Sequence, residues 1–151
     1  MYESDEKWML QAIHYAREAA RSGEVPVGAV IVGTDGNILS AASNLTIANN
    51  DPTAHAEIIA LRQAAIRVEN YRLSGTTVYS TIEPCAMCAG ALVNARVARL
   101  VYGARDERFG AVESVFRLCD NPALNHRLQL TSGVLEASCK GLMQDFFRAR
   151  R

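Results

Sequence analysis

The sequence predicts an α/β fold, a three-layer α/β/α sandwich whose central mixed sheet of about five strands carries helices on both faces. Short apolar runs rich in β-branched residues alternate with longer segments of helical apolar spacing. The first two short runs flank a tight-turn signal, and no repeat, low-complexity tract or linker interrupts the chain. Helices alternating with strands after an initial hairpin are typical of a layered sheet. The pattern leaves the strand order open.

The first quarter of the chain predicts a helix followed by a hairpin. Residues 5–22 place apolar side chains at helical spacing, with Ser4 as the expected N-cap and Gly23 as the expected stop. Residues 27–33 and 38–42 are apolar runs joined by a segment that contains an Asp-Gly pair. Two such runs around an Asp-Gly turn favour an antiparallel hairpin.

The middle of the chain predicts two helices around one strand. Apolar positions over residues 54–68 have helical spacing, and residues 76–81 form a short strand-like run. Pro84 is expected to open the next helix, which ends near Ala95, because proline is well tolerated in the first turn of a helix.

The last third is less regular. Residues 100–102 predict a short strand, and the segment 105–126 is expected to mix loop, strand and a short helix. Residues 128–130 predict an edge strand, and residues 135–148 predict a closing helix.

Composition excludes several classes of protein. The 151 residues are 49% hydrophobic and 21% charged, as in a globular domain. No apolar run approaches the roughly 18 residues that a membrane span needs. The acidic N-terminus lacks the basic and apolar regions of a signal peptide. We therefore expect a soluble, cytoplasmic protein with no membrane partner.

Charge is unevenly distributed although the formal net charge is zero. Residues 1–95 carry 6 basic and 10 acidic side chains, whereas residues 96–151 carry 10 basic and 6 acidic ones. Arg148, Arg150 and Arg151 crowd the C-terminus. Such a tail suits contact with phosphates, and the alternative is an ordinary solvated chain end.

Two fragments carry the chemistry, His55-Ala56-Glu57 and Pro84-Cys85-Ala86-Met87-Cys88. They supply one imidazole and two thiols, which is a set of three zinc ligands with a fourth position left for water. Cys85 and Cys88 share one face at a helix start, where the helix N-terminus favours the thiolate. Glu57 remains as a general acid/base beside the metal.

The cysteines also have other interpretations. A C-x-x-C pair alone suggests a redox pair or half of a structural zinc site. Cys119 and Cys139 stand alone, so a second pair is missing, and we expect both to be small buried hydrophobic residues. His14 has no partner pattern and is expected at the surface or satisfied within its helix. These points favour a catalytic metal site formed by His55, Cys85 and Cys88.

Beyond the metal motif, the chain resembles the TadA-type tRNA adenosine deaminases of the cytidine deaminase superfamily. The metal motif marks the superfamily, and the later segments are more specific to the tRNA branch. The matching segments are residues 23–29, 51–57, 71–73, 83–91, 103–106, 125–127 and 146–148.

The resemblance implies a cytidine-deaminase-like fold and a single zinc-dependent deaminase domain over residues 1–151. It further implies hydrolytic deamination of adenosine to inosine at the wobble position of a tRNA anticodon, in particular an arginine tRNA. The implied partners are a tRNA anticodon stem-loop and a second copy of the chain in a homodimer, with one Zn²⁺ per subunit. The target nucleotide would be splayed out, because a stacked base cannot reach the metal.

The resemblance also implies substrate-binding residues. Asn44 would hydrogen-bond the inserted base or its sugar. Pro26, Val27 and Ala56 would line the base pocket. The further implied RNA-facing positions are Arg105, Asp106, Asn125, Phe147 and Arg148.

Each of these residues has a structural alternative. Asn44 is also suited to capping a turn, and Arg105 and Asp106 to forming an exposed ion pair. Phe146 and Phe147 cannot both face a core on one helix, so one is expected to be buried and the other to face solvent or RNA. Phe109 departs from the small or polar residue typical of the family, which affects the expected RNA affinity and flanking-base preference.

Two other functions fit the same metal site. One is deamination of a free base or nucleoside such as guanine or cytosine. The other is a catalytically silent zinc-binding subunit that only helps to bind RNA. Retention of Glu57 argues against the silent subunit, because loss of the proton shuttle is the simplest route to inactivity.

Overall fold

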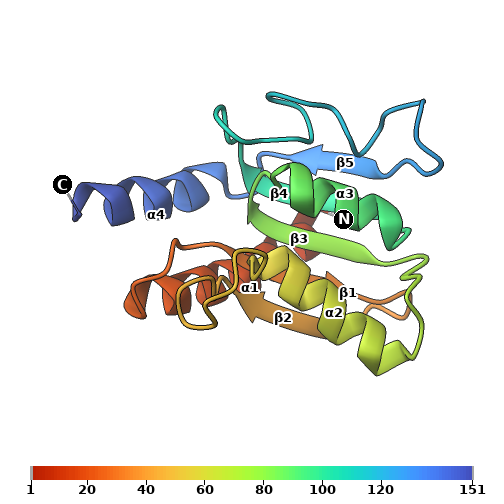
Figure 1. Cartoon of the computed structure of the whole chain (residues 1–151), viewed down its shortest axis with the longest axis horizontal. Helices are drawn as coiled ribbons and strands as arrows, with labels where there is room; N and C mark the ends of the chain where they lie inside the picture. Colours follow the sequence, from red (N-terminus) through yellow and green to blue (C-terminus); the bar gives the residue numbers. More distant parts are fainter. Residues whose placement is uncertain (1, 151) are drawn as a thin grey trace.

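The computed structural model describes residues 2–150, and these form a five-stranded sheet flanked by helices (Figure 1). The elements in chain order are α1 (Tyr2–Arg21), β1 (Gly28–Val32), β2 (Ile38–Ser43), α2 (Ala56–Val68), β3 (Thr77–Ile82), α3 (Ala86–Asn94), β4 (Arg99–Ala104), β5 (Gln129–Ser132) and α4 (Glu136–Arg148). Within the described residues, none of these helices has the length and apolar character needed to cross a lipid bilayer.

The sheet is mixed, as predicted. Its strand order is β2-β1-β3-β4-β5. The hairpin strand β1 pairs antiparallel with β2 and with β3, whereas β3, β4 and β5 run parallel to one another. The predicted edge strand, β5, does lie at an edge. The hairpin turn contains Gly36 at a φ of +81°, a left-handed conformation that glycine adopts without strain.

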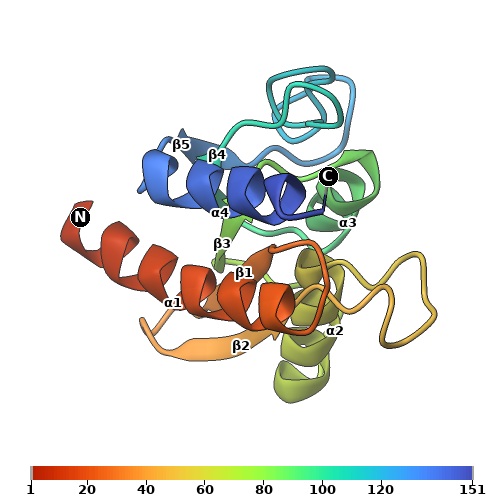
Figure 2. The ribbon, with the colours of Figure 1, turned by 90° about the vertical axis from the view of Figure 1, so that its left-hand side faces the viewer.

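Alternate residues of the strands face two separate apolar layers. Val30 and Val101 pack with α1 and α4 on one face. Ile31 and Leu100 pack with α2 and α3 on the other. Figure 2 shows α1 and α4 side by side toward the viewer, with α2 and α3 at the right of the picture. The predicted three-layer α/β/α sandwich is therefore confirmed.

The topology brings four strand ends to one end of the sheet. Gly28, at the start of β1, lies opposite Ser43, at the end of β2. Ile82, at the end of β3, is level with Ala104, at the end of β4. Because β1 runs antiparallel to β3, all four ends lie together. The residues next to these ends are Val27, Asn44, Glu83 and Arg105.

Most predicted elements are confirmed to within one or two residues, but Ser4 and Pro84 do not have the predicted roles at the starts of their helices. Ser4 lies inside α1 and does not cap it, because tertiary bonds of Asp5 hold the first turn. Pro84 lies two residues ahead of α3, and Cys85 occupies the N-cap with an extended backbone (φ −73°, ψ 177°). The Pro84 carbonyl accepts the N–H of Ala111 at 2.8 Å, so the proline belongs to the turn before the helix.

The expected strand and short helix within 105–126 are also wrong. From residue 105 to residue 128 the described chain consists of turns and irregular structure. Its backbone N–H groups bond partly to backbone carbonyls and partly to side chains, chiefly the carboxylates of Glu83 and Asp106, which together accept six of them. Because these acceptors replace strand or helix partners, the segment is ordered without regular secondary structure.

A buried carboxylate joins α1 to the sheet. Asp5 is 3% exposed and accepts hydrogen bonds from the Tyr79 hydroxyl at 2.9 Å and from Arg99 Nη1 and Nη2 at 2.9 and 2.7 Å. Arg99 also donates to Thr131 Oγ1 on β5 at 2.9 Å. Burial alone would raise the pKa of Asp5, but the hydrogen bonds from Arg99 and Tyr79 and the charge of Arg99 outweigh it, so the pKa is lowered.

Replacing Asp5 with asparagine is expected to lower the free energy of unfolding by about 1–3 kcal/mol near pH 7. Folding lowers the pKa of Asp5. Its contribution is therefore complete above the unfolded pKa of about 4 and is lost as the pH falls through the folded value. Urea denaturation across this range measures both effects. A gap between wild type and variant that does not narrow below about pH 4 would contradict this role.

Candidate metal centre and substrate pocket

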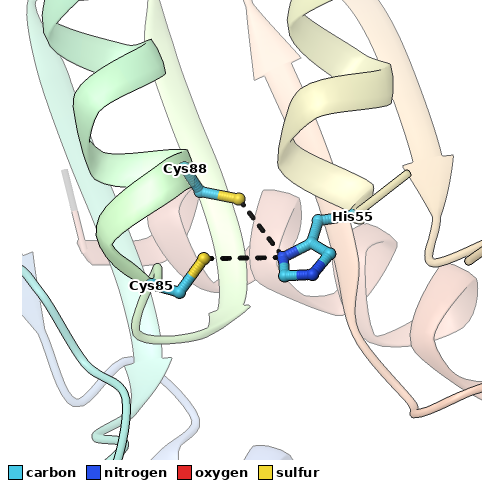
Figure 3. A group of neighbouring side chains, drawn as sticks. All are labelled: His55, Cys85 and Cys88. Atoms are coloured by element: carbon cyan, nitrogen blue, oxygen red, sulfur yellow. Dashed lines mark hydrogen bonds between the residues drawn. The ribbon is translucent and has the colours of Figure 1, made fainter. Parts of the chain in front are cut away.

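Two helix N-termini meet at the candidate site. His55 is the N-cap of α2 (φ −71°, ψ 150°), and Cys85 is the N-cap of α3. Neither side chain caps its own helix, so both remain free to turn toward the gap between the helices. Cys88 lies one turn further along α3 and is fully buried. Figure 3 shows the three side chains pointing toward one another.

The donor atoms have the spacing of a tetrahedral zinc site. His55 Nδ1 lies 3.6 Å from Cys85 Sγ and 3.5 Å from Cys88 Sγ, the contacts dashed in Figure 3. With a Zn–N bond near 2.0 Å and a Zn–S bond near 2.3 Å, tetrahedral geometry separates nitrogen and sulfur by about 3.5 Å. The residues thus form a metal site of the kind found in zinc deaminases, with three protein ligands.

The site favours the thiolate form of Cys85. A hydrogen bond from Cys88 lowers the pKa of the Cys85 thiol to about 4, and His55 adds to this effect against the opposing influence of burial. The same bond and burial raise the pKa of Cys88. Hydrogen bonding to Cys85 raises the pKa of His55. The arrangement therefore offers one ready thiolate, which is the form of cysteine that binds metal.

Glu57 lies in the first turn of α2, two residues after His55. Its carboxyl is 2% exposed but lines the cavity beside the donors. Burial raises the pKa of Glu57 to about 7, against smaller opposing effects that include the charge of His55. A carboxyl in this range can both accept and release a proton near neutral pH, as general acid/base chemistry requires.

A cavity of about 690 Å³ opens over the donors. This volume is within the range of small-molecule pockets. Six of the nine residues expected to bind substrate line it, and these are Val27, Asn44, Ala56, Arg105, Asp106 and Phe147. Among the described residues, the cavity lining does not include Pro26, Asn125 or Arg148.

The other three expected substrate residues lie elsewhere. Pro26 is buried beside Val27. Asn125 is exposed in the irregular segment, and its carbonyl accepts a hydrogen bond from Arg96 at 3.0 Å. Arg148 lines a second hollow that adjoins the cavity through Arg108, Met143 and Phe147. Arg151 lies outside the described residues.

Asn44 both holds its turn and faces the cavity. The side chain is 6% exposed, its Nδ2 donates to the Val25 carbonyl at 3.3 Å, and its Oδ1 accepts the N–H of Thr46 at 3.4 Å. The turn-capping alternative is therefore correct as a description of its bonds, and its position in the cavity is compatible with contact to a base.

Asp106 holds the turn that follows it. Its Oδ1 accepts the N–H groups of Arg108 and Phe109 at 3.0 and 3.1 Å. Within the described chain, Asp106 and Arg105 form no ion pair, so the ion-pair alternative is not observed. Arg105 is exposed and lines the cavity.

One of the two phenylalanines of α4 is buried and the other is exposed, as expected. Phe146 is 8% exposed and stacks under the Arg150 guanidinium, 3.5 Å from the ring centroid. Phe147 is 46% exposed and lines the cavity. Cys119 and Cys139 are buried, as predicted, and His14 is exposed. The exposed Phe147 ring is thus available at the cavity to stack on a base.

Sequence reasoning missed two buried glutamates, Glu24 and Glu83. They are 1% and 2% exposed, and each binds backbone N–H groups of a loop that lines the cavity. Each lies within a segment that matches the family (23–29 or 83–91), but a charged residue is ordinarily at the surface, so the pattern carried no signal of burial. The other cavity residues not singled out are Val25, Thr46, Ile82, Glu107, Arg108 and Met143.

Comparison with known proteins places this architecture among deaminases. The MafB19-like deaminase family matches residues 3–151. The tRNA-specific adenosine deaminase of Haemophilus influenzae is 50% identical over 149 residues, covering 99% of this chain and 86% of that protein.

Two solved structures extend the comparison. One comes from work on A-to-I editing by tRNA:A34 deaminases at the wobble position of transfer RNA; it is 42% identical, has a TM-score of 0.87, and the match covers 90% of this chain and 98% of that one. A guanine deaminase from Bacillus subtilis is 35% identical with a TM-score of 0.65, covering 82% of each chain.

Replacing Cys85 or Cys88 with alanine is expected to abolish stoichiometric zinc binding, because two protein ligands remain. Elemental analysis of the purified protein measures this, and thermal denaturation should reveal an accompanying loss of stability. Cys139→Ala is the matched control, because Cys139 is as buried as Cys88 but lies on α4, packed against the opposite face of the sheet. Equal zinc loss in the control would contradict the assignment.

Proposed function

The chain belongs to the family of tRNA-specific adenosine deaminases, and on that premise we propose that it converts adenosine to inosine at the wobble position of a tRNA anticodon. One observation supports this reaction above all. His55, Cys85 and Cys88 have the donor spacing of a zinc site, and the buried carboxyl of Glu57 lies beside them in the same cavity. The substrate is supported by the relatives that match over nearly the whole chain.

In the proposed reaction water replaces the exocyclic amine of adenosine and ammonia leaves. When bound to His55, Cys85 and Cys88, zinc supplies Lewis-acid activation of that water. Glu57 accepts the proton that the water loses, delivers it to N1 of the ring, and then assists protonation of the departing amine. A carboxyl whose pKa is raised toward neutrality suits both transfers.

The cavity suits a nucleotide that has left its stack. A base held within a helical stack cannot reach a recessed donor cluster, so the target nucleotide has to be inserted singly. Val27 and Ala56 offer apolar contacts to the ring, and Asn44 offers a polar contact to base or sugar. The exposed Phe147 ring and the Arg105 side chain are placed to contact neighbouring nucleotides.

Finer assignments rest on the family resemblance. We propose that an arginine tRNA is a substrate, that each subunit of a homodimer holds one Zn²⁺, and that residues 1–151 form a single zinc-dependent deaminase domain acting in the cytoplasm. Asn125 and Arg148, which lie away from the main cavity, would contact RNA beyond the inserted nucleotide.

Deamination of a free base is the second candidate, because the chain is also similar to a guanine deaminase structure. Both reactions would use the same donors and the same carboxyl. They differ in whether the nucleotides on either side of the target contribute to binding, so RNA-bound and free substrates distinguish them.

The zinc-loaded protein is expected to form inosine in an anticodon stem-loop that carries a wobble adenosine. Free adenosine, cytidine and guanine should remain unchanged, because they lack the flanking nucleotides whose binding energy places the target. Chromatography of nuclease-digested RNA measures the product. Turnover of a free base without reaction of the stem-loop would overturn the proposal.

Glu57→Ala is expected to lower kcat on the stem-loop by about 10²- to 10⁴-fold while zinc stays stoichiometric, because a proton shuttle is lost and no ligand is removed. Glu136→Ala is the matched control, since Glu136 lies in the first turn of α4 as Glu57 does in α2. Zinc loss in Glu57→Ala would instead identify Glu57 as a ligand.

A further inference from the structure

One wall of the cavity is built around the carboxylate of Glu83. Its Oε2 accepts the N–H groups of Val112, Glu113 and Ser114 at 3.1, 2.8 and 2.9 Å. Its Oε1 accepts the N–H of Asp106 at 3.1 Å and the Ser114 hydroxyl at 2.5 Å. Five donors therefore converge on one buried side chain, and the segment that contains Arg105 is shaped around it.

The packing around Glu83 leaves no space for a side chain at Gly110. A Cβ on Gly110 would lie 2.5 Å from Glu83 Oε1 and 2.5 Å from the Asp106 carbonyl, closer than real contacts allow. The Glu83 backbone is itself fixed, because its N–H donates to the Ala104 carbonyl of β4 at 2.8 Å. Glu83 thus connects the end of the sheet to the segment that lines the cavity.

Glu24 holds the opposite wall in the same way. Its Oε1 accepts the N–H of Ile47 at 3.0 Å and the Thr46 hydroxyl at 3.4 Å, and its Oε2 accepts the N–H of Ala48 at 2.8 Å. Its own N–H donates to the Ala19 carbonyl at the end of α1 at 2.9 Å. The held loop begins with Asn44 and Thr46, both of which line the cavity.

The two walls are structurally separate. The loop held by Glu24 follows β2, and the segment held by Glu83 follows β4. In the sheet order β2-β1-β3-β4-β5, two strands lie between them. No hydrogen bond in the described chain joins either carboxylate to the other wall, so each wall depends on its own acceptor.

We propose that Glu24 and Glu83 are positioning residues, each of which independently sets one wall of the cavity against the inserted nucleotide and its neighbours. A carboxylate only accepts hydrogen bonds, so it can gather several backbone N–H groups in one place. Glutamine has the same shape but turns an N–H₂ donor toward those groups, which leaves donors unpaired and displaces the loop. The proposal rests on the proposed function for its effect on substrate.

Double-mutant cycles on the stem-loop reaction of the zinc-loaded protein test it. Glu83→Gln and Glu24→Gln are each expected to lower kcat/KM roughly 10- to 100-fold, mainly through KM and with zinc unchanged. Glu83→Gln combined with Arg105→Ala, and Glu24→Gln combined with Asn44→Ala, should cost little more than the larger single effect. In the crossed pairs, Glu83→Gln with Asn44→Ala and Glu24→Gln with Arg105→Ala, the two effects on kcat/KM should multiply, because the two residues belong to different walls.

Amide hydrogen exchange provides a readout that needs no substrate. Glu83→Gln should accelerate exchange at residues 112–114 and not at 46–48, and Glu24→Gln should do the reverse. Gly110→Ala disturbs the Glu83 contact from the other side and keeps the charge, so it covers the case in which Glu83→Gln does not fold. Asp5→Asn is the control for loss of a buried carboxylate remote from the cavity, with kcat/KM unchanged per folded molecule.

The outcomes separate the two proposals. Within-wall effects that multiply, or faster exchange in both loops from one substitution, would overturn the positioning role. A wild-type protein that leaves the stem-loop adenosine intact would remove the proposed function, and the exchange pattern would still decide whether each glutamate holds its wall.

Discussion

One imidazole and two thiols can bind the same metal ion only if two helices begin within a few ångströms of each other. The rest of the fold holds the two helices in this position. The helices α2 and α3 lie on the same face of the sheet and contact one another. Their N-caps, His55 and Cys85, are held in extended backbone conformations that leave the side chains free of capping bonds. The same apolar layer that stabilises the fold thereby fixes the donor spacing.

The local sequence pattern was sufficient to predict the layers of the fold and the metal ligands. Hydrophobic periodicity predicted the helices and strands, and the short spacing of Cys85 and Cys88 placed both on one helix turn. Strand order was not predictable, because the pairing of β3 with both β1 and β4 is a long-range property that no local pattern carries. The helix start predicted at Ser4 was wrong, because tertiary bonds of Asp5 overrode the local capping preference.

The pocket walls were harder to predict for a related reason. The segment 105–128 has turns where strand and helix were expected, because the carboxylate of Glu83, 22 residues upstream of Arg105, binds four of its backbone N–H groups. A buried glutamate that binds a distant loop has the same sequence appearance as a surface one. Placement of Asn125 and Arg148 outside the main cavity likewise depends on how the irregular segment and α4 turn, which spacing alone does not encode.

A loop held at a few points by a carboxylate has an evolutionary consequence. Strands are constrained by register, since a shift of one residue turns every side chain to the opposite face. The 105–128 segment has no such register, so its exposed residues, such as 107–109, can be replaced, and its length can drift, at small energetic cost, whereas Ala111, Val112 and Cys119 are fixed in the core. Lineages that keep the anchors at Glu83 and Gly110 can therefore explore new neighbours for the bound base while the metal donors on α2 and α3 stay unaltered. Selection can act on recognition and on chemistry separately within one small fold.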